Sequence, residues 1–412
     1  MKNSLQSRIL YNNNTPKKDR TTKTIHKVLT RDFILCFFAY FAFSFVFNIL
    51  TPTLPIYLSK LGSNEVEIGL LIGGFAVSSL VLRPFVGRAL LKIPEKTFMI
   101  VGALLFAISS VAYLLVSPFW SFLILRIFQG IGYAFFNTAS FTLIANISSE
   151  AHRGQSFSNF YLAFNVSSAL APPLGMLLIN HFGFTLLFLV CLGLSLCALF
   201  ISTKLGKRQM ASSDNSPIED GFLLSRKALP PSIVAFFPLF IWGAVVTFFP
   251  LYAVNHGVSN PGLFFTASAI MIILCRVLGG KILDLYSRER IILPCFTTYI
   301  ISMVIIAFSK TETMFILAAL IYGIGPAFLT PALLTDALDR GGSSRGPVMG
   351  TFQAMTDLGI SLGPVIMGII VQATSYPIMF LCLALLSIID LNYFYFFVRK
   401  RGGLLNDEAF HP

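Results

Sequence analysis

The sequence predicts an all-α membrane protein with twelve transmembrane helices in two parallel-related six-helix bundles. Three observations predict this fold class: the apolar composition, the recurrence of apolar runs long enough to span a bilayer, and an internal repeat. Of the 412 residues, 55% are hydrophobic and only 12% are Asp, Glu, Lys or Arg, and the mean hydropathy is +0.78. Soluble domains carry about 25% charged residues and need a polar exterior, so this composition indicates a chain surrounded by lipid.

Twelve apolar runs are long enough to cross a hydrocarbon core of about 30 Å, which takes about 20 residues of α-helix. Backbone groups in lipid must hydrogen-bond within their own segment, so the runs are expected to be helices. A β-barrel would instead show short segments of alternating polarity. The runs cover residues 33–58, 66–90, 97–117, 119–144, 155–179, 183–203, 231–254, 262–286, 291–309, 313–337, 347–372 and 376–398.

Polar segments divide these helices into two halves. Residues 1–31 are basic and lack the apolar stretch of a secretory signal, so we expect a tail, with an organellar transit peptide as the alternative. Residues 204–230 are rich in Ser, Lys and Arg and are interpreted as a linker. The predicted units are therefore a tail (1–31), a first bundle (32–203), a linker (204–230), a second bundle (231–399) and a second tail (400–412).

The basic residues lie almost entirely on one side of the predicted membrane. If the helices alternate in direction, 24 Lys and Arg fall in the loops and tails of one side, against only Lys60 and Lys310 on the other. The positive-inside rule then predicts that both termini are cytoplasmic, in a cell (inner) membrane. The net charge of +12 is thus explained by topology and contact with membrane lipid rather than by nucleic-acid binding.

The two halves carry the same short patterns in the same order, at offsets of 192 to 195 residues. Such a repeat, with six helices in each half, predicts two halves of the same orientation. The matched groups are Pro55-Ile56-Tyr57 and Gly62 with Pro250-Leu251-Tyr252 and Gly257; Arg83, Gly87 and Arg88 with Arg276, Gly280 and Lys281; Gly130-Ile131-Gly132 with Gly323-Ile324-Gly325; and Arg153-Gly154, Asn165 and Pro172 with Arg345-Gly346, Asp357 and Pro364.

No arrangement of residues indicates catalysis or a bound cofactor. The six cysteines are scattered through apolar helices without a C-x-x-C pair, and the five histidines fall in tails or loops. Neither pattern supplies a metal site or an activated nucleophile. A G-x-x-x-x-G-K-[ST] nucleotide loop is also missing from the sequence. An enzyme is therefore not predicted, and the linker and tails are too short for a signalling domain of a receptor.

Several motifs resemble those of the major facilitator superfamily. "RIFQGIG" (126–132) is similar to its fourth-helix pattern R-x-x-Q-G-x-G, and "GKILDLYSRER" (280–290) to its loop signature G-x-L-A-D-R-x-G-R-R. The equivalent first-half loop, "GRALLKIPEK" (87–96), has Leu91 where the family has Asp, and "APPLG" (171–175) resembles part of the exporter pattern G-P-x-x-G-G.

This resemblance implies a secondary active transporter, without a cofactor, that works by alternating access. It implies proton-coupled efflux of a small amphiphilic molecule by an antiporter that acts as a monomer. The alternative is an importer of a nutrient or metabolite by proton symport.

The resemblance also places a latch at the cytoplasmic helix ends. Glycine would allow close approach of two helices, and the carboxylate of Asp284 would accept charge-assisted hydrogen bonds from a neighbouring helix end. The alternative is that the charges only anchor the loops. The latch candidates are Gly87, Arg88, Gly280, Lys281, Asp284 and Arg288, and the helix-packing candidates are Gly130, Gly132, Pro172, Pro173 and Pro364.

Arg126 is the first charge within the membrane that calls for a function. Placing a cation at this depth costs at least about 2.5–3.5 kcal/mol, so it must face a cavity or a partner. Gln129 and Asn137 follow it on later turns, and Asn48 supplies a polar group on the first helix, so all four are predicted to line the pathway. By contrast Arg83 and Arg276, nearer the cytoplasmic end, are interpreted as side chains that extend to the interface.

Asp357 is the second such charge, and we predict that it binds the transported proton. It lies near mid-membrane, and its counterpart in the first half is the polar Asn165. Burial disfavours an ionised carboxylate and a nearby cation favours it, so a change of surroundings would load and release a proton. Arg126 is the cation predicted to oppose it. The rival acid, Asp390, is expected to be hydrated near the cytoplasmic end, and the alternative for Asp357 is a structural bond to backbone or serine.

Overall fold

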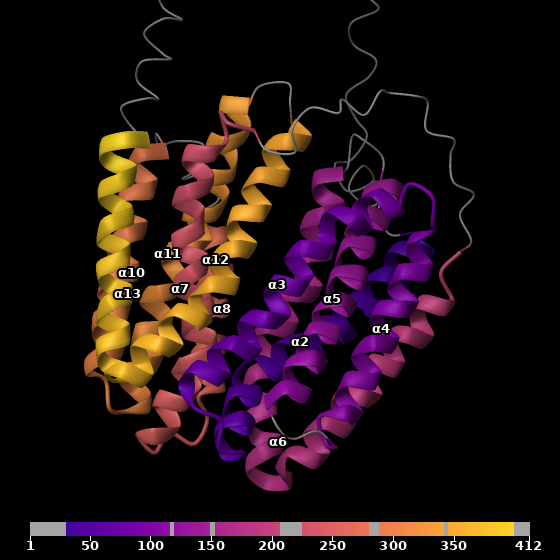
Figure 1. The fold of residues 1–412 in the computed structure, drawn as a ribbon. Coiled ribbons are helices and arrows are strands. Elements are labelled where there is room, and N and C mark those ends of the chain that lie inside the picture. Colours follow the sequence, from indigo (N-terminus) through magenta and orange to yellow (C-terminus); the bar gives the residue numbers. More distant parts are fainter. Residues whose placement is uncertain are drawn as a thin grey trace, which may run out of the picture.

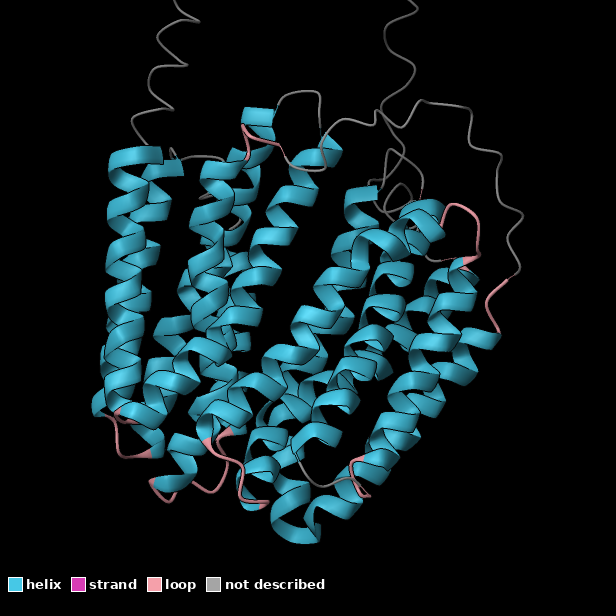
Figure 2. Ribbon diagram, in the orientation of Figure 1, coloured by secondary structure: helices cyan, strands magenta, loops and turns pink. Residues whose placement is uncertain are grey.

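The computed structural model describes residues 30–115, 119–148, 153–206, 225–279, 288–341 and 345–398, and every regular element within them is helical (Figure 2). Ten of the described helices are long and apolar enough to cross a membrane, and Gly262–Leu278 forms a shorter apolar helix. The elements are α2 (Arg31–Lys60), α3 (Glu65–Ala89), α4 (Glu95–Ala112), α5 (Phe119–Ile147), α6 (Arg153–Thr203), α7 (Leu229–Asn255), α8 (Gly262–Gly279), α10 (Arg288–Phe308), α11 (Glu312–Gly341), α12 (Arg345–Ala373), α13 (Tyr376–Tyr393) and the π-helical turn η2 (Phe394–Val398).

Local sequence signals set the helix ends. Asn64 begins α3 with a capping box, because its side chain accepts from the Glu67 amide (2.9 Å) and Glu67 accepts from the Asn64 amide (3.1 Å). Gly62 and Gly257, with φ of 89° and 76°, follow α2 and α7. This left-handed conformation favours glycine, and its recurrence at matched positions agrees with the sequence repeat.

Helix α6 differs from the expected pair of helices with a loop between them. Residues 153–203 are helical on both sides of Gly183, which alone is non-helical (φ 80°, ψ 179°). Glycine adopts this conformation at little cost, so the chain changes direction at one residue. The expected break at residues 180–182 was therefore slightly misplaced.

The first and second parts of the chain form separate groups of helices (Figure 1). Helices α2 to α6 lie together, and α7 to α13 lie beside them. We call the end at which α2 begins and α3 ends the tail side, and the opposite end the far side. Helices α3 and α12 are close at the far side and diverge toward the tail side.

Glycines allow the two groups to touch closely, and two of these contacts join a glycine of one group to a proline of the other. A Cβ atom on Gly69 of α3 would overlap the Pro364 carbonyl of α12, and one on Gly262 of α8 would come within 2.5 Å of the Pro172 carbonyl carbon of α6. Polar contacts also close the far side: the Val66 amide donates to Gln372 (3.3 Å), and the Asn180 amide donates to the Ser259 carbonyl (2.7 Å). The far side is therefore closed in this structure.

Aromatic rings fill much of the interior, and apolar side chains cover much of the outside. Phe43 of α2 stacks on Phe136 of α5, with ring centroids 4.0 Å apart. On the outside, Val277 and Leu278 are 75% and 80% exposed. Helices that are apolar both on the face packed inside the protein and on the face exposed outside indicate a hydrocarbon environment rather than water.

Candidate functional site

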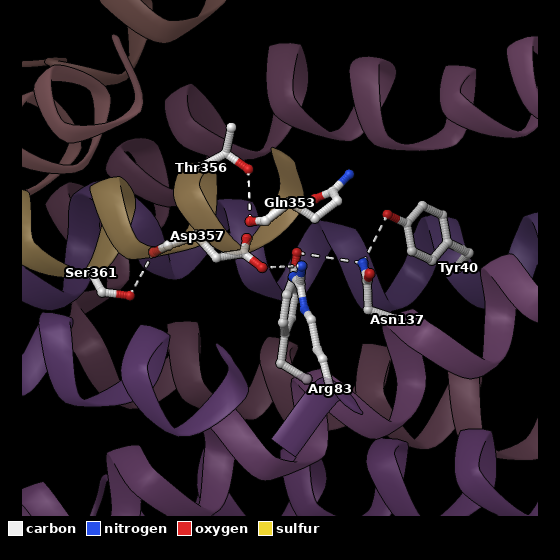
Figure 3. A network of polar contacts seen from close by, with 8 residues as sticks. Tyr40, Arg83, Asn137, Gln353, Thr356, Asp357 and Ser361 are labelled. Carbon is white, nitrogen blue, oxygen red and sulfur yellow. Dashed lines mark hydrogen bonds and ion pairs between the residues drawn. The ribbon is translucent and has the colours of Figure 1, made fainter. Parts of the chain in front are cut away.

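Asp357 of α12 forms an ion pair with Arg83 of α3, so the pair joins the two groups of helices (Figure 3). The side chains are only 26% (Arg83) and 16% (Asp357) exposed. The backbone carbonyl of Asp357 accepts a hydrogen bond from the Ser361 hydroxyl (2.7 Å). Two sequence interpretations are thereby wrong: the cation opposite Asp357 is Arg83 rather than Arg126, and Arg83 does not simply extend to the interface.

Polar side chains of the first group surround this ion pair. The Asn137 amide donates to the hydroxyls of Tyr40 (3.3 Å) and Tyr133 (3.4 Å), which links α2 to α5 beside the pair (Figure 3). Tyr133 and Tyr161 lie close enough to interact electrostatically with Arg83 and Asp357. Asn137 thus lies at this polar cluster, whereas Gln129 and Arg126 lie elsewhere.

Arg126 is held within α5 and against α3. It is 6% exposed, and it donates to the Leu71 carbonyl (3.0 Å) and to Gln129 Oε1 (2.6 Å). Its guanidinium lies 4.5 Å from the centroid of the Phe75 ring, a favourable cation–π geometry. Tyr113 also donates to Gln129 Oε1 (2.6 Å). These neutral partners offset the cost of burying the cation, so Arg126 does not need a carboxylate.

Arg126 and Gln129 line a cavity between the two groups of helices. The cavity has a volume of about 80 Å³ and takes residues from α2, α3, α5, α7 and α12. Its wall is mostly apolar, which suits the apolar part of a small ligand. The lining residues are Phe47, Leu50, Thr51, Leu54, Ile72, Phe75, Ala76, Arg126, Gln129, Gly243, Val246, Ile360 and Pro364.

Asn48 and Asn165 do not line the cavity that Arg126 and Gln129 line. The Asn48 amide donates to the Ser44 carbonyl (2.9 Å) and to the Ser167 hydroxyl (3.0 Å), so it ties α2 to α6 instead of lining the cavity. Asn165 is half-buried on α6 and makes no side-chain hydrogen bond with any residue of the described ranges.

The packing candidates lie at close helix contacts. A Cβ on Gly130 would overlap the Phe75 carbonyl, and one on Gly132 would come within 2.9 Å of Leu105. Pro172 and Pro364 are the partners of the two glycine contacts described above, and the Pro173 carbonyl accepts from the Asn260 amide (3.4 Å).

The predicted latch is mostly outside the described residues. Gly280, Lys281 and Asp284 fall there, and the side chain of Arg288 is not described although the residue begins α10. Gly87 faces open space, and Arg88 is exposed. Gly87 makes no close approach in this conformation, in which α3 and α12 diverge toward the tail side, so the latch stays a prediction for a conformation closed on that side.

Asp390 also differs from expectation. It is 1% exposed, and neither carboxylate oxygen has a hydrogen-bond partner among the described residues. It lies on α13 close enough to Tyr299 of α10 to interact with it electrostatically. The expected hydration near the helix end is wrong, because α10 covers this face of α13.

Comparison with protein families decides the class of the protein. The model of the Major Facilitator Superfamily matches residues 36–264 and 257–410. The chain belongs to the Major Facilitator Superfamily. Members of this superfamily are transporters of small molecules rather than enzymes, and the protein is accordingly an integral membrane transporter.

Individual members of the superfamily match most of the chain. The staphylopine export protein of Staphylococcus aureus is 25% identical over 359 residues, which cover 83% of this chain and 89% of that one. Multidrug resistance protein 2 of Bacillus subtilis is 25% identical over 375 residues, with coverage of 87% and 92%. The crystal structure of the nucleoside transporter NupG has the same fold, with a TM-score of 0.73 at 15% identity and coverage of 89% and 98%.

The sequence reasoning missed the role of Arg83, although a signal was present. Arg83 follows Gly69 by 14 residues, and Arg276 follows Gly262 by the same distance. The matched spacing shows that the two arginines occupy equivalent positions in the two halves, and Arg83 lies at the contact between them. Helix snorkelling places no such constraint on their positions.

Proposed function

We propose that this transporter exports a small amphiphilic molecule in exchange for protons. Two six-helix halves with twelve spans would rock around the site between α3, α5, α7 and α12. The linker 204–230 and both termini would be cytoplasmic, in the inner membrane, and the protein would act as a monomer. The export named for the staphylopine relative supports the direction, and the multidrug resistance named for the Bacillus subtilis relative agrees with it.

The Arg83–Asp357 pair carries the proposal of proton coupling. It is an ion pair between the two halves, on the open side of the Gly69–Pro364 contact. In the described state burial opposes ionisation of the Asp357 carboxyl group, and the neighbouring Arg83 cation favours it. Protonation of Asp357 would remove the attraction and leave Arg83 without its counter-charge, so proton binding and movement of α3 relative to α12 would be linked.

Asp390 is a less suitable coupling group because it lies on α13 against α10, within one half. A proton bound there would not change a contact between the halves. The cytoplasmic latch around Asp284 and Arg88 is retained as a proposal for the state in which the tail side is closed, where Gly87 would approach a neighbouring helix.

Transport into proteoliposomes under a pH gradient tests this function. A dye that the wild type binds should accumulate on the side with the lower pH if the exchange is antiport, and on the side with the higher pH if it is symport. The vesicles must first be shown to hold the pH gradient. Equal dye accumulation with either direction of the gradient then contradicts proton coupling.

A further inference from the structure

A second hollow lies on the outer surface of the protein, between α3 and α5 and beside α12. Its volume is about 660 Å³, larger than that of the cavity between the halves, about 80 Å³. Val81 and Trp120 in its wall are 56% and 70% exposed, so it opens away from the protein. We call it the α3–α5 groove, lined by Val77 and Val81 of α3, Trp120, Leu123 and Ile127 of α5, and Val365 of α12.

Two glycines of α3 shape the inner wall of the α3–α5 groove. A Cβ on Gly73 would come within 2.5 Å of the Val365 side chain and 2.9 Å of the Ser361 carbonyl oxygen, and one on Gly74 within 3.0 Å of Leu123. Because these side chains are missing, α12 approaches α3 closely and the groove stays open beside this contact. Such a hollow between membrane helices gains van der Waals contacts only if lipid enters it.

The length of the groove matches one leaflet of a bilayer. It runs along α5 from Phe119, the first residue of that helix on the far side, to Ile131. A helix rises about 1.5 Å per residue, so this stretch is about 18 Å long, and half of the hydrocarbon core is about 15 Å. Trp120 lies at the far-side end, and tryptophan is enriched where a membrane meets water. The groove therefore extends from the far-side boundary to about mid-membrane.

The lining of the groove offers no polar group to a ligand other than the Trp120 ring nitrogen. Of the described residues that line it, only Ser78 and Trp120 carry polar side-chain atoms. The Ser78 hydroxyl already donates to the Phe75 carbonyl (2.9 Å). Contacts along the groove are thus contacts with hydrocarbon, which a lipid of the far-side leaflet supplies.

The wall of the groove comes from both halves of the protein. Val77 and Leu123 belong to the first half, and Val365 belongs to the second. The wall is complete only while α12 lies against Gly73 of α3, as it does with the far side closed. A ligand that needs both halves binds this state better and raises its population.

We propose that the α3–α5 groove binds one straight acyl chain of a lipid in the far-side leaflet, and that the bound chain favours the conformation closed on the far side. This inference goes beyond the proposed exchange of substrate for protons, and it depends neither on the substrate nor on the coupling ion.

Fluorescence of Trp120 tests the binding of the chain. The sequence has two tryptophans, Trp120 and Trp242, so the Trp242→Phe variant reports the groove alone. The full chain is placed in nanodiscs that contain a fixed fraction of phosphatidylcholine brominated on a straight chain, which quenches a neighbouring tryptophan. The remaining lipid is either palmitoyl-oleoyl phosphatidylcholine or diphytanoyl phosphatidylcholine, which has the same headgroup and methyl-branched chains.

Branched chains fit the walls poorly and lose van der Waals contacts. The brominated straight chain should therefore compete better against the branched lipid, and quenching of Trp120 should correspond to about threefold or greater preference for the straight chain. Equal quenching in the two lipids would overturn the site.

Two variants separate the groove from the bilayer as a whole. Val77→Phe places a larger side chain in the groove at a position that is 40% exposed, and it should abolish the preference at Trp120. A tryptophan at Ile108 of α4, which is 55% exposed and outside the groove, is the matched control. With Trp120 and Trp242 both replaced by Phe, it should show no preference. A preference retained in Val77→Phe, or an equal one at Ile108, would overturn the proposal.

The distance between spin labels at Leu61, after α2, and Thr374, after α12, tests the conformational effect. Both residues are exposed at the far side, and the six native cysteines are replaced by alanine. The ratio of closed to open far side should be about fivefold higher in straight-chain than in branched-chain lipid. Val77→Phe should give one ratio in both lipids. A wild-type ratio that is the same in both lipids, or a Val77→Phe ratio that changes as the wild type does, would overturn the effect.

Discussion

Replacing Asp357 by Asn is the most direct perturbation of the proposed proton site. The amide has nearly the same size as the carboxylate and keeps one acceptor oxygen, but its NH2 group donates instead of accepting and it cannot titrate. The backbone carbonyl that accepts from Ser361 is unchanged. The substitution therefore separates the charge of Asp357 from its packing.

The structure sets the size of the effect. Removing one partner of a fully buried pair costs about 3–5 kcal/mol, whereas exposed pairs contribute about 0.2–1 kcal/mol. With side chains 26% and 16% exposed, the Arg83–Asp357 pair lies between these limits, and solvent screening places it at about 1–2 kcal/mol. This corresponds to a roughly 5- to 30-fold change in the equilibrium that the pair controls.

The assay compares two modes of transport in proteoliposomes. Asp357→Asn should lose gradient-driven accumulation of a dye that the wild type transports, while exchange of that dye at equal pH on both sides should persist. Arg83→Gln, which removes the same pair from the other helix, should weaken coupling without abolishing the titratable group. Accumulation by Asp357→Asn with the wild-type pH dependence would refute the reasoning and make Asp390 the next candidate.

Three further predictions concern topology, the latch and the contact between the halves. A cysteine placed at Ser213 in the linker should resist membrane-impermeant labelling of intact cells, and labelling would reverse the predicted orientation. Asp284→Asn should slow turnover more than it weakens substrate binding, and wild-type kinetics would reduce Asp284 to an anchor. Gly69→Val should overlap the Pro364 backbone and destabilise the closed far side by about 1–3 kcal/mol. The rate of disulfide formation between cysteines introduced at the far-side helix ends should then fall. Gly193→Val is the control, because a Cβ at Gly193 meets open space, and it should leave this rate unchanged. Equal effects of the two substitutions would contradict the role of the Gly69 contact.

The places of the ten described membrane-length helices could be predicted from the apolar runs of the sequence. The length of an apolar run and the conformation of a glycine such as Gly62 or Gly257 depend on local chemistry. The repeat also placed Asp357 and Asn165 at equivalent points of two helices, because matched spacing along a helix fixes matched height. The break in α6 falls at Gly183, the residue directly after the expected break at 180–182.

Only the tertiary structure decided which charges meet. Asp357 lies 274 residues from Arg83 along the chain, and whether α12 packs on α3 or against α5 determines its partner. Arg126 is satisfied by Gln129 and the Leu71 carbonyl within its own half, which spacing could not reveal. Asp390 is buried because α10 covers it. Pairing of buried charges depends on the distances between helices, and those distances come from packing rather than from the pattern of any one segment.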